Sequence, residues 1–297
     1  MGLSHYPSII TMPKVAKPYP TLLEFLCKSF PSVPQDLWAQ RISRGKVLDS
    51  NDFPLTIESA YTPGRLIKYF REVSREPEIP FTESILYHDE ELLVSCKPPF
   101  LPVTPGGKYV NECLLNRLRL KTANDDLVPL HRIDRETAGI VLFSVNRKNR
   151  NLYAELFRRG CVKKTYQALS RSIPPPGETA WQVTNRIVQG DPWFRMHTVP
   201  GIANARSAIK LIGTCGDLTR FELEPLTGKT HQLRVHMSGL GFGIANDRLY
   251  PELQPETPDD FLHPLQLLAK MVSFLDPVTG TRREFVSPRE LSLGVSP

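Results

Sequence analysis

The chain has few cysteines, and their placement argues against two common roles of that residue. The five cysteines are odd in number and widely spaced, with no Cys-x-x-Cys pair and no histidine at zinc-ligand spacing. We therefore expect reduced thiols and neither a disulfide framework nor a zinc site. A catalytic cysteine is the less favoured alternative, because a buried structural cysteine is the usual case.

The sequence also lacks the features of a secreted or membrane protein. Its N-terminus has no basic region followed by an apolar core and a small-residue cleavage site. With 40% hydrophobic and 23% charged residues, the composition is typical of a globular protein. We expect a cytoplasmic monomer without membrane association, and its 297 residues are enough for one large domain and a smaller one.

Three familiar site motifs are missing. A phosphate-binding loop ending in Gly228-Lys229-Thr230 would require glycine at position 223, which is Leu223. No Gly-x-Ser-x-Gly segment supports a triad hydrolase. His131, His231 and His236 form no His-Glu-x-x-His motif, and the last two are five apart and do not share a helix face, so no metal is expected.

Positive charge is concentrated in one part of the chain. The formal net charge is +6, and residues 131–170 alone carry nine Lys or Arg against three Asp or Glu. A positive field of this kind attracts a polyanion such as nucleic acid. The alternative is a basic face that only makes the protein soluble.

The chain divides by composition into three segments. Residues 1–20 are rich in proline and predict an irregular arm. Residues 21–80 predict a small α+β module, with two helical patterns followed by short strands and turns. The proline-rich segment REPEIPFTE marks a boundary near residue 80, and residues 81–297 form the larger domain.

The larger domain shows mixed elements without a regular βαβ alternation, which favours an α+β fold. Two strand-like runs flank residues 88–91, and another apolar run follows Arg135. A helical pattern ends at Gly160, and VKKTYQALS alternates as a strand. HQLRVHMSGLG predicts a helix with Thr230 as its N-cap and Gly239 as its end.

The segment HRIDRETAGIVLFS sets Asp134 between Arg132 and Arg135, directly before an apolar, strand-like run. One hypothesis is a carboxylate kept ionised by guanidinium groups so that it can act as a nucleophile or base. The other is a solvated ion-pair cluster at the start of a strand. Tyr166 and Arg234 also have ordinary alternatives, as a core aromatic and an exposed helical charge.

Three segments, HRIDRETAG, KKTYQAL and LTGKTHQLRVHMSGLG, occur in the order of the signature segments of the RluA-type RNA pseudouridine synthases, and the chain resembles that family from about residue 85 to 288. The resemblance implies a mixed, largely antiparallel central sheet of the pseudouridine synthase type with flanking helices. It implies isomerisation of uridine in RNA, with no cofactor and no metal.

The resemblance also implies roles for individual residues. Asp134 is the essential carboxylate acting on a uridine that has left the RNA helix, and Arg132 enters the stack that the base vacates. Tyr166 packs on the uracil ring and assists proton transfer, and Arg234 pairs with Asp134. Covalent attack by Asp134 and assisted elimination from the sugar both stay open. The other expected substrate-binding residues are His131, Lys229, Thr230 and His231.

Two positions depart from the family pattern. Lys229 replaces a common arginine, which keeps the charge and loses the forked geometry, and residues 243–247 lack the usual Pro and Gly before Asp247.

The module at 21–80 resembles an S4-like RNA-binding domain, with a family-specific extension as the alternative. We expect ribosomal RNA as substrate, with transfer RNA open. A non-catalytic RNA-binding or ribosome assembly factor on a synthase scaffold is the alternative function.

Overall fold

The computed structural model describes residues 2–291, which form two compact units. One contains the chain up to Pro77 together with Gly106–Asn111, and the other contains Glu78–Pro105 and the chain from Glu112 onward. Within residues 2–291, no helix has the length and apolar character needed to cross a membrane.

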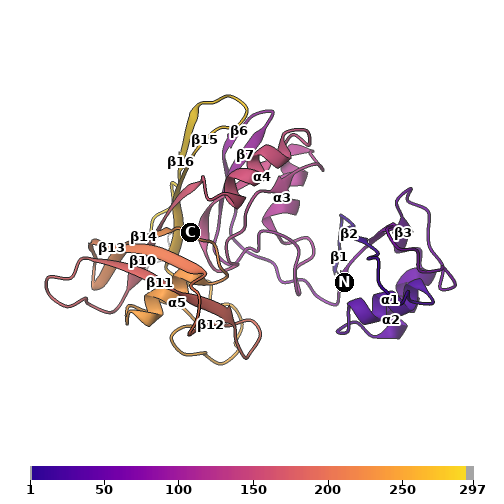
Figure 1. Cartoon of the computed structure of the whole chain (residues 1–297), viewed down its shortest axis with the longest axis horizontal. Helices are drawn as coiled ribbons and strands as arrows, with labels where there is room; N and C mark the ends of the chain where they lie inside the picture. Colours follow the sequence, from indigo (N-terminus) through magenta and orange to yellow (C-terminus); the bar gives the residue numbers. More distant parts are fainter. Residues whose placement is uncertain (1, 292–297) are drawn as a thin grey trace. The chain divides into compact units, whose positions relative to one another are not determined.

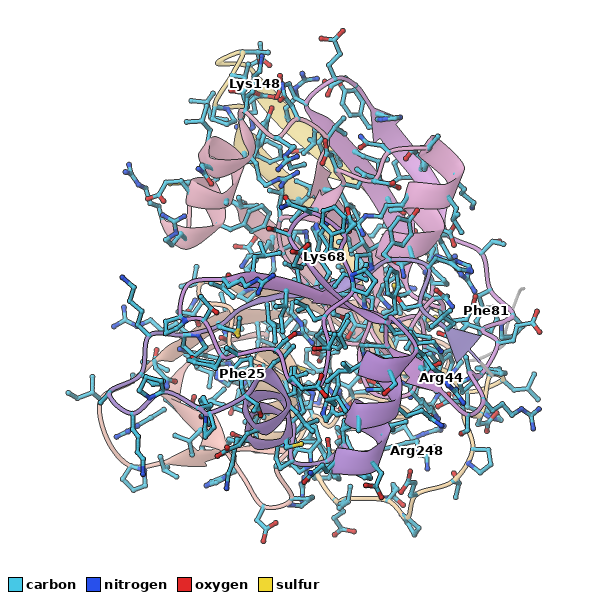
Figure 2. All side chains as sticks on the ribbon, turned by 90° about the vertical axis from the view of Figure 1, so that its right-hand side faces the viewer. Phe25, Arg44, Lys68, Phe81, Lys148 and Arg248 are labelled. Atoms are coloured by element: carbon cyan, nitrogen blue, oxygen red, sulfur yellow. The ribbon has the colours of Figure 1, made fainter. Side chains whose placement is uncertain are left out.

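The first unit packs two helices against a small sheet. Helices α1 (Leu22–Ser29) and α2 (Gln35–Ser43) coincide with the two predicted helical patterns, and Thr21 caps α1 by accepting the amide of Glu24. Phe25, labelled in Figure 2, is among the buried residues of this unit's core, as are Leu26 and Trp38. The strands are β1 (Gly2–Leu3), β2 (Ser8–Thr11), β3 (Val47–Asp49), β4 (Leu66–Tyr69) and β5 (Glu72–Val73).

The prediction of an irregular arm over residues 1–20 is wrong for Ser8–Thr11. This segment is strand β2, and it pairs antiparallel with β4 in a three-stranded sheet of order β2-β4-β3. Pro7 and Pro13 lie just outside the strand, so neither interrupts its hydrogen bonds. The segment belongs to the small module, because Met12 is buried in the module's core.

An eleven-stranded sheet forms the second unit. Its main order is β12-β11-β13-β14-β10-β15-β9-β7-β6, while β16 also pairs with β15 and β8 with β9. All pairings are antiparallel except that between β9 and β15. The strands are β6 (Ser84–His88), β7 (Leu92–Lys97), β8 (Val128–Pro129), β9 (Ala138–Ser144), β10 (Lys163–Ser170), β11 (Ala180–Gln189), β12 (Met196–Val199), β13 (Ala205–Cys215), β14 (Leu218–Pro225), β15 (Leu267–Leu275) and β16 (Arg282–Val286).

Three helices accompany this sheet: α3 (Leu114–Thr122), α4 (Arg150–Arg158) and α5 (Gln232–Gly239). In Figure 1, α3 and α4 lie near β6 and β7, and α5 lies near β10 to β12. Tyr153 of α4 packs among buried residues of β7, β9 and β15, and Leu233 and Met237 of α5 pack against β10, β13 and β14. The predicted α+β fold with a mixed, largely antiparallel sheet and flanking helices is confirmed.

One row of residues across the sheet explains how distant segments meet. Tyr166 of β10 lies opposite Ala269 of β15, and Ala269 lies opposite Gly139 of β9. Gly139 has φ of +113°, and a Cβ there would stand 2.3 Å from the Ala269 carbonyl oxygen, so only glycine permits this approach. The loop before β9, which carries Asp134, therefore ends one strand away from β10, which carries Tyr166, with only β15 between them.

Candidate active site

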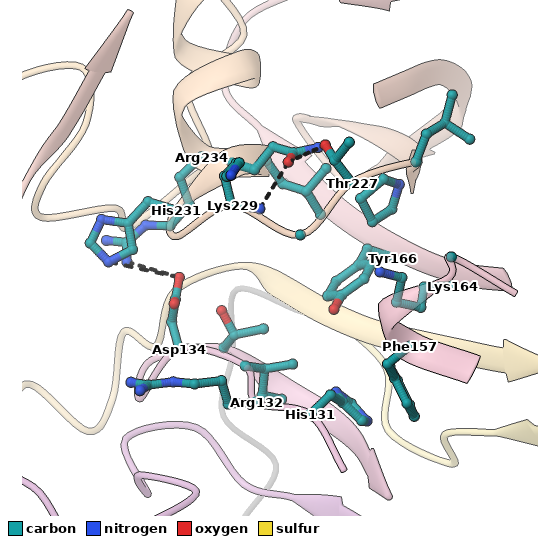
Figure 3. A pocket seen from close by; sticks show the side chains of 18 of the residues that line it. His131, Arg132, Asp134, Phe157, Lys164, Tyr166, Thr227, Lys229, His231 and Arg234 are labelled. Atoms are coloured by element: carbon teal, nitrogen blue, oxygen red, sulfur yellow. Dashed lines mark hydrogen bonds and ion pairs between the residues drawn. The ribbon is translucent and has the colours of Figure 1, made fainter. Parts of the chain in front are cut away.

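A cavity of about 640 Å³ opens where these loops converge. Its walls come from the loop before β9, the end of α4, strand β10 and the segment that joins β14 to α5. A volume of this size suits a small organic ligand. Figure 3 shows Asp134 pointing toward His231 and Arg234, while Tyr166 lies further along the same cavity with its hydroxyl turned toward Asp134.

Asp134 is partly exposed to the cavity and faces two nitrogen atoms of α5 and its N-cap. Its side chain is 26% exposed, and its Oδ2 lies 3.5 Å from Arg234 Nη1 and 3.9 Å from His231 Nε2. Both distances are longer than a typical hydrogen bond, so the carboxylate is held mainly by attraction to the charged Arg234 guanidinium. The predicted ion pair between Asp134 and Arg234 is therefore present.

Arg234 nevertheless has a stronger partner, Asp247. Its Nε and Nη2 donate to the two carboxylate oxygens at 2.8 and 2.7 Å, and the side chains are 2% and 0% exposed. Burial opposes the charge, but Asp247, then Asp134 and Glu136, raise the pKa of Arg234 above its usual range. In the sequence Asp247 stands out only as part of an unusual turn, and no motif there indicates that it anchors Arg234.

Tyr166 presents an uncharged phenol to the cavity. Burial, with a further contribution from the negative charge of Asp134, raises the pKa of Tyr166 well above its ordinary value. Within residues 2–291 its hydroxyl makes no hydrogen bond, so both its proton and its lone pairs are available to a ligand.

The two arginines that flank Asp134 in the sequence diverge in the structure. Arg135 donates from Nη1 and Nη2 to both oxygens of Asp259, each at 2.8 Å, which fixes the loop. Arg132 is exposed at the cavity wall and makes no ion pair with any described residue. Arg135 is therefore structural, whereas Arg132 is available to a ligand.

Lys97 holds the loop before β9, which carries Asp134, through hydrogen bonds to backbone carbonyls. No sequence motif indicates this role. Its side chain is fully buried, and Nζ donates to the carbonyl oxygens of Pro98, Leu101 and Arg135 at 2.9, 2.7 and 2.9 Å. Burial lowers the pKa of Lys97 to about 7, although three carbonyl acceptors satisfy every proton of the ammonium form. The bond to the Arg135 carbonyl holds the backbone directly after Asp134.

His131 is a neutral ring in the cavity wall. Burial, and then the positive charge of Lys164, lower the pKa of His131 to about 3. Its Nε2 accepts the Leu142 amide at 3.1 Å, and its ring stacks on Phe157 with centroids 4.7 Å apart. The proton of the neutral ring is therefore on Nδ1.

The segment before α5 is shaped by Gln232, a residue of the third signature segment for which the sequence predicts no role. Its Oε1 accepts from the Lys229 amide at 3.0 Å and from the Thr227 hydroxyl at 2.6 Å. This arrangement leaves the Lys229 side chain exposed at the cavity wall, without an ion pair among the described residues. Thr230 lies outside the lining, and its prediction as N-cap is wrong, because the cap residue is His231 and makes no side-chain cap bond.

The structure thus brings together most of the predicted site residues. Asp134, Tyr166, Arg234 and Arg132 line one cavity, as do His131, Lys229 and His231. Among residues 2–291, no group of three or more His, Cys, Asp or Glu side chains is placed to hold a metal ion.

Comparison with known proteins identifies the fold and the activity. The family model described as RNA pseudouridylate synthase matches residues 91–239. An uncharacterized RNA pseudouridine synthase of Synechocystis is 28% identical over 237 residues, which cover 77% of this chain and 79% of that protein. The ribosomal large subunit pseudouridine synthase D of Haemophilus influenzae is 26% identical over 220 residues, covering 69% and 67%.

The solved structure of human RNA pseudouridylate synthase domain containing 4 superimposes with a TM-score of 0.54 at 26% identity, covering 70% of this chain and 88% of that one. The chain belongs to the RNA pseudouridylate synthase family, and to its RluA type. It is accordingly an isomerase, because RNA pseudouridine synthases rearrange uridine without adding or removing atoms.

Proposed function

We propose that the protein isomerises specific uridines of ribosomal RNA to pseudouridine, with the target base flipped into the cavity and Asp134 as the essential carboxylate. The observation that carries this proposal is the placement of Asp134. Its carboxylate faces a cavity whose other wall carries the hydroxyl of Tyr166, and the positive charge of Arg234 stands 3.5 Å behind it.

The reaction requires three events in this space. The bond between N1 of uracil and C1′ of ribose breaks, and the uracil rotates. C5 then bonds to C1′, C5 loses its proton, and N1 gains a proton, so the product is an isomer of the substrate. A carboxylate can assist the first event by attacking C1′ or by removing a proton from the sugar. Asp134 is the ionisable side chain of the lining that combines negative charge with exposure to the cavity.

Tyr166 supports the proposal from the base side. Its flat ring offers a surface for uracil while the base is detached, and its hydroxyl can donate or accept a proton through a hydrogen bond. A phenol that stays protonated is useful here, because a second negative charge beside Asp134 would repel the first.

The cavity wall carries the charge needed to hold RNA. Arg132, Lys164 and Lys229 line the cavity and make no ion pair within the described part of the chain. Three such cations are suited to phosphates flanking the flipped nucleotide. We assign Arg132 to the gap left by the base and His131 to contacts around it, as the resemblance implies. Thr230 lies outside the cavity lining and would contact RNA beyond it, and His231 acts on the substrate through Asp134.

The choice of ribosomal RNA rests on similarity and on domain organisation. The relative from Haemophilus influenzae is named for the large ribosomal subunit. We also propose that the first unit acts as an S4-like RNA-binding module. Lys68 of β4 and the cations directly before β3 and β4, Lys46 and Arg65, are paired with acidic residues. Exposed residues such as Arg44 would therefore have to carry the contact. We expect a cytoplasmic monomer.

The test is tritium release from RNA labelled at C5 of uracil, with ribosomal RNA and transfer RNA assayed separately. The proposal predicts release from ribosomal RNA and little from transfer RNA, and mapping of pseudouridines in cells with and without the gene would locate the positions. Release only from transfer RNA would overturn the choice of substrate. RNA binding without any release would support an assembly factor in place of an enzyme.

A further inference from the structure

We propose that His231 and Tyr250 form a positioning pair that fixes Asp134 through its Oδ2 atom and leaves Oδ1 to meet the substrate. The inference rests on the proposed function, because it assigns a task to one oxygen of the essential carboxylate. Neither residue touches the substrate's reacting atoms in this account. Both act through Asp134.

The direction of the hydrogen bonds around Tyr250 determines where its proton points. The Tyr250 hydroxyl accepts the Met196 amide at 2.7 Å and lies 3.0 Å from His231 Nδ1. An amide can only donate, so the hydroxyl uses a lone pair for Met196 and has its own proton free for His231. Within residues 2–291 this hydroxyl makes no other hydrogen bond, so we infer that it donates its proton to Nδ1 of His231.

This bond selects one tautomer of His231. Burial lowers the pKa of His231 despite the nearby charge of Asp134, so the ring is neutral. In a neutral imidazole with an acceptor at Nδ1, the proton is on Nε2. Nε2 is the atom that faces Asp134 Oδ2 at 3.9 Å.

The backbone conformation of His231 also indicates that the position of its imidazole ring is specifically maintained. Its φ of +53° lies in the left-handed region, a strained conformation for a non-glycine residue. The His231 side chain does not offset this backbone strain by capping α5, because it makes no cap hydrogen bond. The ring instead stands edge-on to Tyr250, with centroids 5.7 Å apart and an interplanar angle of 81°.

A second group converges on the same oxygen. Arg234 Nη1 is buried without a hydrogen-bond partner, and it lies 3.5 Å from Asp134 Oδ2. Arg234 also stacks on the Tyr250 ring, 5.5 Å from its centroid, and Asp247 Oδ1 accepts the Tyr250 amide. Two N–H donors therefore point at Oδ2. If substrate binding shortened the distances from Oδ2 to Arg234 Nη1 and His231 Nε2 by less than about 1 Å, both contacts would become hydrogen bonds.

Kinetics of Tyr250→Phe test the pair. The variant keeps the ring that stacks on Arg234 and loses only the hydroxyl, so we expect kcat for tritium release to fall roughly 10- to 100-fold with little change in KM. The control is Tyr87→Phe, which removes a hydroxyl bonded to Asp89 outside the cavity lining and should leave kcat unchanged. An unchanged kcat in Tyr250→Phe would overturn the proposal.

A double variant separates positioning from general damage to the fold. If Tyr250 acts through the imidazole, adding Tyr250→Phe to His231→Ala should lower kcat no further than His231→Ala alone. Multiplicative losses would show that the two residues act independently and would contradict the pair.

The tautomer can be measured without any reaction. In the full chain labelled with ¹⁵N-histidine, we expect His231 to show a protonated Nε2 and a bare Nδ1 at neutral pH, and to lose this preference in Tyr250→Phe. A protonated Nδ1 in the wild type would overturn the inference. Because this result does not depend on turnover, it stays informative even if the wild type released no tritium and the proposed function failed.

Discussion

Replacing Asp247 with asparagine should destabilise the second unit and loosen its cavity. Asp247 is completely buried and binds two nitrogen atoms of Arg234, which is itself 2% exposed. Asparagine keeps one acceptor oxygen, but it removes the charge and points an amide group at a guanidinium. Breaking a buried ion pair on one side costs about 3–5 kcal/mol, and we expect roughly the lower value because of the retained oxygen.

Thermal unfolding monitored by circular dichroism measures this cost. At about 2–4 °C per kcal/mol for a domain of this size, Asp247→Asn should lower Tm by roughly 6–12 °C. The matched control is Asp260→Asn, whose side chain is 58% exposed, pairs with His263 at the surface and accepts the Leu262 amide. Its change should stay within about 0.5 kcal/mol. Equal Tm values for the two variants would refute the claim that Asp247 anchors Arg234.

Three further outcomes are expected. If Lys229 contacts one phosphate, Lys229→Ala should weaken RNA binding and make the slope of log affinity against log salt shallower by about 0.7 to 0.9, as filter binding across salt concentrations would show. The pKa of His131 is about 3 in the folded protein, below its value in the unfolded chain. Its contribution to the free energy of unfolding is therefore complete above pH 6.5 and is lost as the pH falls toward 3, at up to about 1.4 kcal/mol per pH unit. An NMR titration should find the His131 ring uncharged at pH 5. Gly139→Ala places a Cβ 2.3 Å from the Ala269 carbonyl oxygen at positive φ, so it should cost more than about 3 kcal/mol in urea unfolding.

Elements with a strong hydrophobic period are predictable from the sequence. Helix α1, helix α2 and strand β10 follow the expected segments, because each must bury one face and its sequence repeats at the matching period. Strand β2 escapes prediction, since the prolines around it give the whole segment an irregular composition. In the structure they flank the strand.

The ordered motifs predict that Asp134, Tyr166 and Arg234 lie in one site, but they do not supply the contacts among these residues. The pairing of Arg234 with Asp247 depends on how α5 and the following loop pack, which no local pattern contains. The Thr230 cap fails for a similar reason. A cap needs a particular backbone angle, and the chain gives the N-cap position to His231 in a left-handed conformation.

The central claim is that Asp134 performs the chemistry. The most direct measurement compares tritium release by wild type and Asp134→Asn under single-turnover conditions, alongside RNA binding by both proteins. The account predicts that the variant binds RNA as the wild type does and releases no tritium, because the amide keeps the shape of the carboxylate and loses its charge. Tritium release at the wild-type rate by Asp134→Asn would contradict it.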